Sequence, residues 1–170
     1  MELDRTLIKG TGTAYPKLWE PGVPRGLYRV SYSESVVLRR AVLQFATYFR
    51  REFQYDFIQY SLDRNIDDTD EKVSAYLFGE PMYCGKLSSY GACCFRYRDK
   101  YTDLQPHWAL QWIWLHPYKR NDGILTELWP YFESKFRNFM VESPLSRAME
   151  YFLKNKPMQY PHDYKAIAIE

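Results

Sequence analysis

The chain has 170 residues, of which 46% are hydrophobic and 18% aromatic, and its 23 basic and 21 acidic residues leave a formal net charge of +2. This length favours one hydrophobic core over two. The near-balanced charge excludes the overall field of a dedicated nucleic-acid binder and leaves only a local basic patch as a route to nucleic acid. The first ten residues lack a signal pattern and the apolar stretches fall short of the ~20 residues needed to cross a bilayer, so we expect a cytoplasmic protein without a membrane segment.

The first 26 residues are predicted to form an irregular lead-in, because residues 10–26 contain four glycines and three prolines. Residues 27–170 are predicted to form a single domain. This domain begins with the strand "LYRVSY", in which polar and apolar residues alternate. Residues 33–53 follow as a long amphipathic helix with Ser33 or Ser35 as its N-terminal cap. The apolar positions that repeat there at helical spacing are Leu38, Ala41, Val42, Phe45, Phe49 and Phe53.

The acidic segment "SLDRNIDDTDEK" partly resembles a calcium-binding loop. Asp63, Asn65 and Asp67 stand at ligand positions of such a loop. However, Asp68 stands where the loop requires a glycine for its sharp turn, and Ser74 stands where it requires a bidentate glutamate. We therefore interpret this segment as a solvated acidic loop.

Two β-rich runs, residues 72–80 and 90–101, are separated by a loop with Gly and Ser and are predicted to form an antiparallel pair. In the second run, alternation directs one of Cys93 and Cys94 inward and the other outward. A small buried thiol is favoured here over a nucleophile. The chain has three cysteines, Cys84, Cys93 and Cys94, and this odd number indicates reduced thiols. The sequence has no second Cys or His cluster to complete a zinc site.

The segment "HWALQWIWLHP" is the most strand-like part of the chain, and Pro117 ends it because proline cannot donate to a β-ladder. Apolar residues then resume at helical spacing from Ile124 through Phe139, with Pro130 expected to kink the helix or restart it. Three further elements are predicted, namely a short strand over residues 139–143, a helix over 146–156 and a final strand over 164–170. This mixed alternation predicts an α/β (α+β) layer architecture with antiparallel pairs early and a crossover late.

The turn between this strand and the next helix is the strongest candidate for a binding site. A helix start presents backbone N–H groups without intrahelical partners, and the helix dipole adds partial positive charge, so an anion is stabilised there. Gly123 has no side chain to block close approach, and Lys119 and Arg120 bring donors for phosphate oxygens. The turn is therefore predicted to bind a pyrophosphate, although an ordinary surface turn with flanking cations has similar residues.

In this context the segment "LHPYKRNDGILTEL" resembles the acyl-CoA-binding motif of the GCN5-related N-acetyltransferase (GNAT) family. In that motif a strand ends at an apolar residue and a proline, and an Arg/Gln-x-x-Gly-x-Gly/Ala turn leads into a helix. The matching positions here are Leu115, Pro117, Arg120, Gly123, Ile124 and Leu128. The preceding hairpin and the following strand and helix agree with the family's order of elements, so the resemblance covers roughly Leu27 to Lys156.

The resemblance implies a fold, a cofactor and a reaction. The fold would be a mixed, mostly antiparallel central sheet flanked by helices, and the cofactor would be acetyl-CoA or another short acyl-CoA. A primary amine, on a small molecule or a protein, would attack the thioester directly, and a backbone N–H near Leu115 would polarise its carbonyl. The amides of residues 121–126 would hold the pyrophosphate, and the strand edge at 114–115 would pair with the pantetheine arm. The residues implied in cofactor binding are Leu115, Arg120, Asn121, Asp122, Gly123, Ile124, Leu125 and Thr126.

The sequence departs from the family pattern in three places. Leu125 stands where the family has Gly or Ala, and its side chain would crowd the pyrophosphate unless it turns into the core, while Pro130 removes one hydrogen bond of the helix. In the last helix the family often has a Tyr four residues after Ala148, where this chain has Phe152, and Tyr151 comes one residue earlier.

Three residues are candidates for proton transfer. Tyr151 would protonate the departing thiolate, although a Tyr on an apolar helix face also serves packing. His116, beside the turn, and Glu80, at the end of a strand, are candidates for the base that deprotonates the amine. Both positions also suit ordinary solvent-exposed side chains.

Two other functions remain open from the sequence. Leu125 and Pro130 are compatible with a non-catalytic binding or inhibitory module that keeps the fold without using the cofactor. The run "CFRYRDKY" is compatible with stacking on single-stranded nucleic acid. It equally fits an ordinary strand with its aromatic residues on one face and its arginines on the other.

Overall fold

The computed structural model describes residues 7–8, 22–63, 69–82, 86–99 and 105–156. Its elements follow the expected order of strand, helix, two strands, strand, helix, strand and helix, and a two-residue strand is added near the N-terminus. The elements are β1 (Leu7–Ile8), β2 (Leu27–Val30), α1 (Val36–Phe53), β3 (Val73–Met82), β4 (Lys86–Arg98), β5 (His107–Leu115), the short 3-10 helix η1 (Pro117–Lys119), α2 (Ile124–Phe136), β6 (Met140–Val141) and α3 (Arg147–Lys154). The final strand predicted over residues 164–170 lies outside the described residues.

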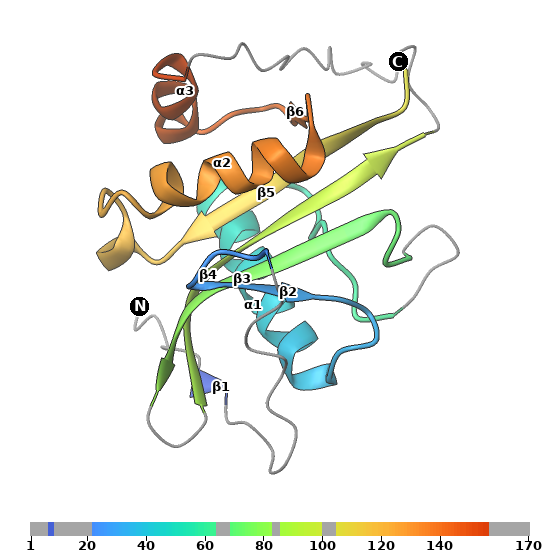
Figure 1. The fold of residues 1–170 in the computed structure, drawn as a ribbon, viewed down its shortest axis with the longest axis vertical. Helices are drawn as coiled ribbons and strands as arrows, with labels where there is room; N and C mark the ends of the chain where they lie inside the picture. The colour runs from blue at the N-terminus through green and yellow to red at the C-terminus, as the bar shows by residue number, and fades with distance from the viewer. Residues whose placement is uncertain (1–6, 9–21, 64–68, 83–85, 100–104, 157–170) are drawn as a thin grey trace.

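One six-stranded sheet runs through the molecule (Figure 1). Its strands lie in the order β2-β3-β4-β5-β6, and β1 pairs with the first part of β4. All these pairings are antiparallel except that of β5 with β6, which is parallel and is connected through α2. The predicted mixed, mostly antiparallel sheet, with antiparallel pairs first and a crossover last, is therefore confirmed.

Helices cover both faces of this sheet, with α1 on one face and α2 and α3 on the other (Figure 1). Each interface has its own aromatic core. Phe45 of α1 packs against Trp114 of β5 with ring centroids 5.6 Å apart, and Phe132 of α2 packs against Phe95 of β4 at 5.0 Å. Both faces of the central strands are therefore buried, and aromatic residues contribute to the core on each face.

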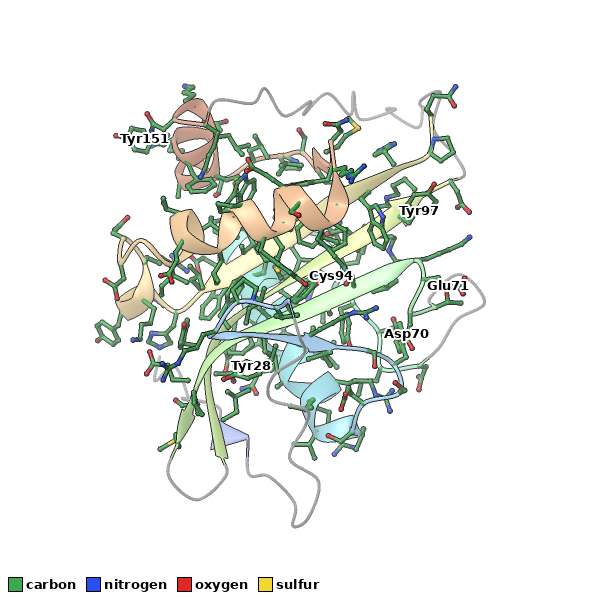
Figure 2. All side chains as sticks on the ribbon, viewed as in Figure 1. Tyr28, Asp70, Glu71, Cys94, Tyr97 and Tyr151 are labelled. Atoms are coloured by element: carbon green, nitrogen blue, oxygen red, sulfur yellow. The ribbon has the colours of Figure 1, made fainter. Side chains whose placement is uncertain are left out.

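Cys93 and Cys94 lie in the middle of β4, where Figure 2 places Cys94 at the centre of the sheet. Cys94 belongs to the core on the α1 side and Cys93 to the core on the α2 side, and both are buried cysteines that form no disulfide among the described residues. The expectation that one of them points outward is wrong, because helices cover both faces of the sheet here. Burial raises the pKa of the Cys93 thiol, as expected for a packed, protonated cysteine.

The start of α1 is capped as the sequence predicted. The Ser35 hydroxyl accepts a hydrogen bond from the Leu38 N–H at 3.5 Å, so Ser35 rather than Ser33 is the N-cap. Capping by a serine satisfies one of the N–H groups that the first turn of a helix leaves without a partner.

The course of α2 differs from the prediction at its end. The helix continues through Pro130 without a restart, and the alternative, a kink at Pro130, stays a prediction; Trp129 and Phe132 are buried beside Pro130 and hold the helix against the sheet. It ends before Phe139, since Arg137 and Asn138 adopt positive φ angles of 23° and 53°, which a helix does not accommodate.

The acidic segment after α1 is attached to the sheet at its described end. The Asp70 carboxylate accepts a hydrogen bond from the Tyr32 N–H at 2.5 Å. Three residues of the partial calcium pattern, Asn65, Asp67 and Asp68, lie outside the described residues. Among the residues that are described, no group of three or more His, Cys, Asp or Glu side chains is arranged to hold a metal ion. None of the described helices combines the length and apolar character that a membrane span requires.

Candidate functional site

β5 and β6 are paired over only a short distance and then separate. The pairing covers Ala109 and Leu110 of β5, and Glu142, just after β6, donates a hydrogen bond from its N–H to the Leu110 carbonyl at 3.0 Å. Residues 111–115, the C-terminal part of β5, therefore have no partner strand on that side in the described part of the chain.

The free edge of β5 presents backbone groups to the space that β6 leaves. The His116 N–H donates to the Tyr90 carbonyl of β4 at 2.8 Å, and backbone groups of successive residues in a strand point to opposite sides. The N–H groups of Ile113 and Leu115 therefore point away from β4. A pocket of about 540 Å³ lies against this end of the strand and is lined by Ile113, Trp114 and Leu115.

The pocket brings together four elements. Besides β5, its wall contains residues 119–126 of the turn and of the first turn of α2, with the exception of Asp122. α3 contributes side chains that include Met149 and Tyr151, and Phe53 at the end of α1 completes the wall.

The turn that leads into α2 contains two residues in the left-handed region. The φ angle is 65° at Asn121 and 76° at Gly123, and asparagine and glycine are the residues that adopt this region at least cost. A Cβ atom added at Gly123 would meet no atom within 4 Å. The space beside the Gly123 backbone, which lines the pocket, is therefore open.

The N-terminus of α2 has no side-chain cap. Its first backbone hydrogen bond runs from the Glu127 N–H to the Gly123 carbonyl at 2.9 Å, so the N–H groups of residues 124–126 have no acceptor within the helix. All three of these residues line the pocket. The free N–H groups and the helix dipole make this end of the pocket suited to an anion.

The pocket wall contains most of the residues predicted to bind the cofactor. These are Leu115, Arg120, Asn121, Gly123, Ile124, Leu125 and Thr126. Asp122 is exposed and does not line the pocket. The Leu125 side chain is half-buried and packs against the core on the α2 side as well as lining the pocket, so it turns only partly into the core.

The three residues predicted for proton transfer lie in different surroundings. Tyr151 lines the pocket, and its side chain is 73% exposed on the outer side of α3 (Figure 2). His116 is the cap of η1, since its Nδ1 accepts a hydrogen bond from the Tyr118 N–H at 3.3 Å. Glu80 forms an exposed ion pair with Lys119 at 3.3 Å. Neither His116 nor Glu80 lines the pocket.

An ion pair that the sequence did not reveal joins the turn to α1. Arg120 donates to both carboxylate oxygens of Glu52, at 2.6 and 2.7 Å, and the indole N–H of Trp114 donates to the same carboxylate at 2.7 Å. The hydrogen bond from Arg120 lowers the pKa of Glu52 against the opposing effect of burial, and the Trp114 bond and the Arg120 charge lower it further. Glu52 precedes Arg120 by 68 residues, so no local spacing indicates the pair.

Lys156 is a second residue of the pocket that sequence reasoning missed. Its ammonium nitrogen lies 4.6 Å from the ring centroid of Phe152 and 5.9 Å from that of Trp129. The other two cations of the pocket wall, Lys119 and Arg120, each pair with a glutamate, whereas Lys156 forms no ion pair within the described residues. A lysine just after a helix carries no sequence signal that separates it from an ordinary surface cation.

No protein-family model matches this sequence, and no curated protein matches it significantly. Among solved structures, the chain is similar to an integron cassette protein from the mobile metagenome of V. cholerae, with 11% identity, a TM-score of 0.51, and coverage of 79% of this chain and 85% of that one. It is also similar to an aminoglycoside acetyltransferase from an uncultured soil metagenomic sample, with 12% identity, a TM-score of 0.50, and coverage of 81% and 94%. At such identities the similarity concerns the fold alone. The chain therefore has an acetyltransferase-like fold.

Proposed function

We propose that this protein is an acyl-CoA-dependent N-acetyltransferase that transfers an acetyl group to a primary amine by direct attack on the thioester. The observation that carries this proposal is the uncapped N-terminus of α2, which opens into a pocket of about 540 Å³ beside the free edge of β5. This volume falls within the range of roughly 300–1,000 Å³ that is usual for small-molecule and cofactor sites. The acetyltransferase-like fold supports the proposal at the level of the fold.

The residues of the turn fit a ligand with a diphosphate group. The backbone N–H groups of residues 121–126 would hold the pyrophosphate, and Gly123 leaves open space beside them. Lys156 would add a positive charge that no carboxylate of the described residues neutralises. Hydrogen bonds to charged groups contribute about 1.5–3 kcal/mol each, so two or three of them would dominate the affinity.

The free edge of β5 fits the extended pantetheine arm. The backbone groups of Ile113, which point away from β4, would pair with its amides, as an added strand pairs with a sheet edge. Acetyl-CoA, when bound, supplies the activated acyl group. The Leu115 N–H would polarise the thioester carbonyl, and the pocket wall would hold the acyl group in line for attack.

The amine would approach from the side where β5 and β6 separate. A smaller cavity of about 30 Å³ shares Ile113, Ser146 and Met149 with the main pocket, and its wall also includes Tyr55 and Glu142. A cavity of this size holds little more than one water molecule, since a water needs roughly 10–15 Å³. The acceptor in this proposal is a primary amine, from a small molecule or a protein.

Among the residues predicted for proton transfer, Tyr151 lines the pocket, and we assign it the protonation of the departing thiolate. His116 and Glu80 lie outside the pocket wall. In this proposal they act as the cap of η1 and as the ion-pair partner of Lys119.

A non-catalytic module with the same fold is the second candidate, and one observation favours it. Leu125 lines the pocket at the end that the pyrophosphate would occupy, and its side chain turns only partly into the core. A chain in which Leu125 closes this end would keep the fold and bind no acyl-CoA.

Calorimetric titration of acetyl-CoA into the purified protein distinguishes the two candidates. The enzyme predicts saturable binding and a rise in melting temperature, because a ligand at 100 times its Kd stabilises the native state by about 2.7 kcal/mol. S-acetylpantetheine, which lacks the diphosphate, should bind much more weakly. An absence of binding and of stabilisation at millimolar acetyl-CoA supports the module. Acetyl transfer to a panel of primary amines then tests catalysis.

A further inference from the structure

The Arg120 side chain donates its hydrogen bonds to other groups of the protein. Its Nε donates to the Leu115 carbonyl at 2.8 Å, and its two terminal nitrogens donate to the Glu52 carboxylate at 2.6 and 2.7 Å. Its guanidinium also lies 5.5 Å from the Trp114 ring centroid. A phosphate contact from Arg120, as the family resemblance implies, would therefore require breaking the bidentate pair with Glu52.

These bonds hold the last peptide unit of β5 from both sides. The peptide unit between Leu115 and His116 donates its N–H to the Tyr90 carbonyl at 2.8 Å, and its carbonyl accepts from Arg120 at 2.8 Å. This unit directly follows the peptide unit that carries the Leu115 N–H, so holding it restricts the backbone of Leu115. The bond from Arg120 also closes the turn between residues 115 and 120 into a ring.

Glu52 holds this arrangement from α1. Its carboxylate accepts from the Arg120 guanidinium and from the indole N–H of Trp114, the residue next to Leu115. An isolated, exposed ion pair contributes little, and the side chains of Glu52 and Arg120 are 36% and 34% exposed. A bidentate pair that shares its carboxylate with a third donor is the geometry in which the orientation of the groups is well defined.

We propose that Glu52 is a positioning residue of the acyl-CoA site: it holds Arg120 on the Leu115 carbonyl and so orients the end of β5 and the turn into α2. This inference rests on the proposed function. It assigns Arg120 to the protein rather than to the phosphates, and it makes the C-terminal turn of α1 part of the site although Glu52 itself does not line the pocket.

The sign of the effect of Glu52→Gln on acetyl-CoA affinity tests the proposal. Removal of a negative charge near an anion-binding pocket tightens binding if charge alone matters, and it also frees Arg120 to reach a phosphate. The positioning role predicts the opposite, a loss of affinity of about 5- to 30-fold, as expected for losing roughly one hydrogen bond that orients the site. Glu150→Gln is the matched control, because Glu150 is an exposed carboxylate of α3 that takes no part in these contacts.

Arg120→Lys tests the same ion pair by changing its basic partner. A lysine keeps the charge but cannot bridge the Leu115 carbonyl and both oxygens of Glu52. We expect a loss of affinity similar to that of Glu52→Gln, and the double variant should lose little more than either single variant because the two residues act as one unit. The dependence of the affinity on salt should stay as in the wild type, since no phosphate contact is removed.

Hydrogen exchange of the unliganded protein separates this inference from the proposed function. Glu52→Gln should speed exchange of the His116, Lys119 and Arg120 amides, whose N–H groups all have backbone acceptors, by about tenfold or more, whether or not acetyl-CoA binds. If the wild type does not bind acetyl-CoA, the proposed function is overturned, but the effect of Glu52→Gln on hydrogen exchange can still be measured. Unchanged exchange, or tighter acetyl-CoA binding by Glu52→Gln than by Glu150→Gln, overturns the positioning role.

Discussion

The starts of α1 and α2 differ in whether a capping side chain accepts hydrogen bonds from the backbone N–H groups of the first turn. At α1 the Ser35 hydroxyl accepts from the Leu38 N–H, and at α3 the Ser146 hydroxyl accepts from the Met149 N–H at 3.2 Å. At α2 the N-cap is Gly123, which has no side chain to do so. A capped start uses its donors to stabilise the helix, whereas an uncapped start leaves them for a ligand.

α3 adds a second contrast on the other wall of the pocket. α2 offers backbone N–H groups, while α3 and the residue pair after it offer side chains, among them Tyr151, Asn155 and Lys156. The proposed site therefore combines a binding element whose chemistry is in the backbone with one whose chemistry is in the side chains. Substitutions should therefore change ligand binding at the α3 wall by removing a functional side chain, and at the α2 wall only by blocking or occupying the backbone N–H groups.

The largest expected effect comes from Gly123→Asp, which places a carboxylate at the uncapped helix start. The aspartate would accept hydrogen bonds from the free N–H groups and repel a phosphate, so acetyl-CoA affinity should fall by on the order of 100-fold, measured by calorimetry. The melting temperature of the unliganded protein should fall only modestly: the left-handed φ angle of 76° strains any residue with a side chain, but a Cβ atom at this position meets no neighbour within 4 Å.

Gly22→Asp is the control for backbone strain in this experiment. Gly22 has a φ angle of 87°, similar to the 76° of Gly123, and a Cβ atom there also meets no neighbour within 4 Å. Both variants should therefore have similar stability, and only Gly123→Asp should lose acetyl-CoA. Equal losses of stability and affinity at Gly123 would show that this glycine serves the fold alone.

Tyr151→Phe tests the side-chain wall. If Tyr151 protonates the thiolate, kcat should fall by about 10- to 100-fold, toward the low end of general acid catalysis because an exposed tyrosine competes with water. Acetyl-CoA affinity should not change. Tyr118→Phe is a suitable control, since Tyr118 is 83% exposed and does not line the pocket. Unchanged turnover in Tyr151→Phe would exclude its role as an acid.

Lys156→Met should weaken acetyl-CoA binding by about three- to tenfold, since it removes one cation from the pocket while keeping most of the contact with the Phe152 ring. The remaining affinity should depend less on salt than that of the wild type. Lys154→Met removes an exposed cation at the end of α3, two residues before Lys156, that does not line the pocket, and it should leave both quantities unchanged. The same weakening in both variants would indicate a general effect of charge.

Ser35→Ala should have the smallest effect on the site. The loss of this cap should lower the free energy of unfolding by about 1 kcal/mol, measured by denaturant titration, and leave the Kd of acetyl-CoA unchanged. A loss of affinity in this variant would mean that α1 and the pocket are coupled beyond the Glu52 ion pair, and it would weaken the contrast between capped and uncapped helix starts.

Local sequence patterns were sufficient to predict the strand-turn-helix unit that carries the proposed binding site. The alternating run before Pro117 predicted β5, and the position of Gly123 before a helical repeat predicted an open helix start, because both signals depend only on neighbouring residues. The end of α2 was misjudged, since the spacing of Phe139 fits a helix although the positive φ angles of Arg137 and Asn138 end it first.

By itself, the sequence determined the order and type of the elements and the turn with its free N–H groups, because hydrophobic period, proline and glycine act over a few residues. Only the tertiary structure decided that Cys93 and Cys94 are both buried, that Lys156 reaches the pocket, and that Arg120 is held by Glu52. These outcomes depend on which faces of the sheet the helices cover and on contacts between residues far apart in the chain, and no local spacing encodes such distances.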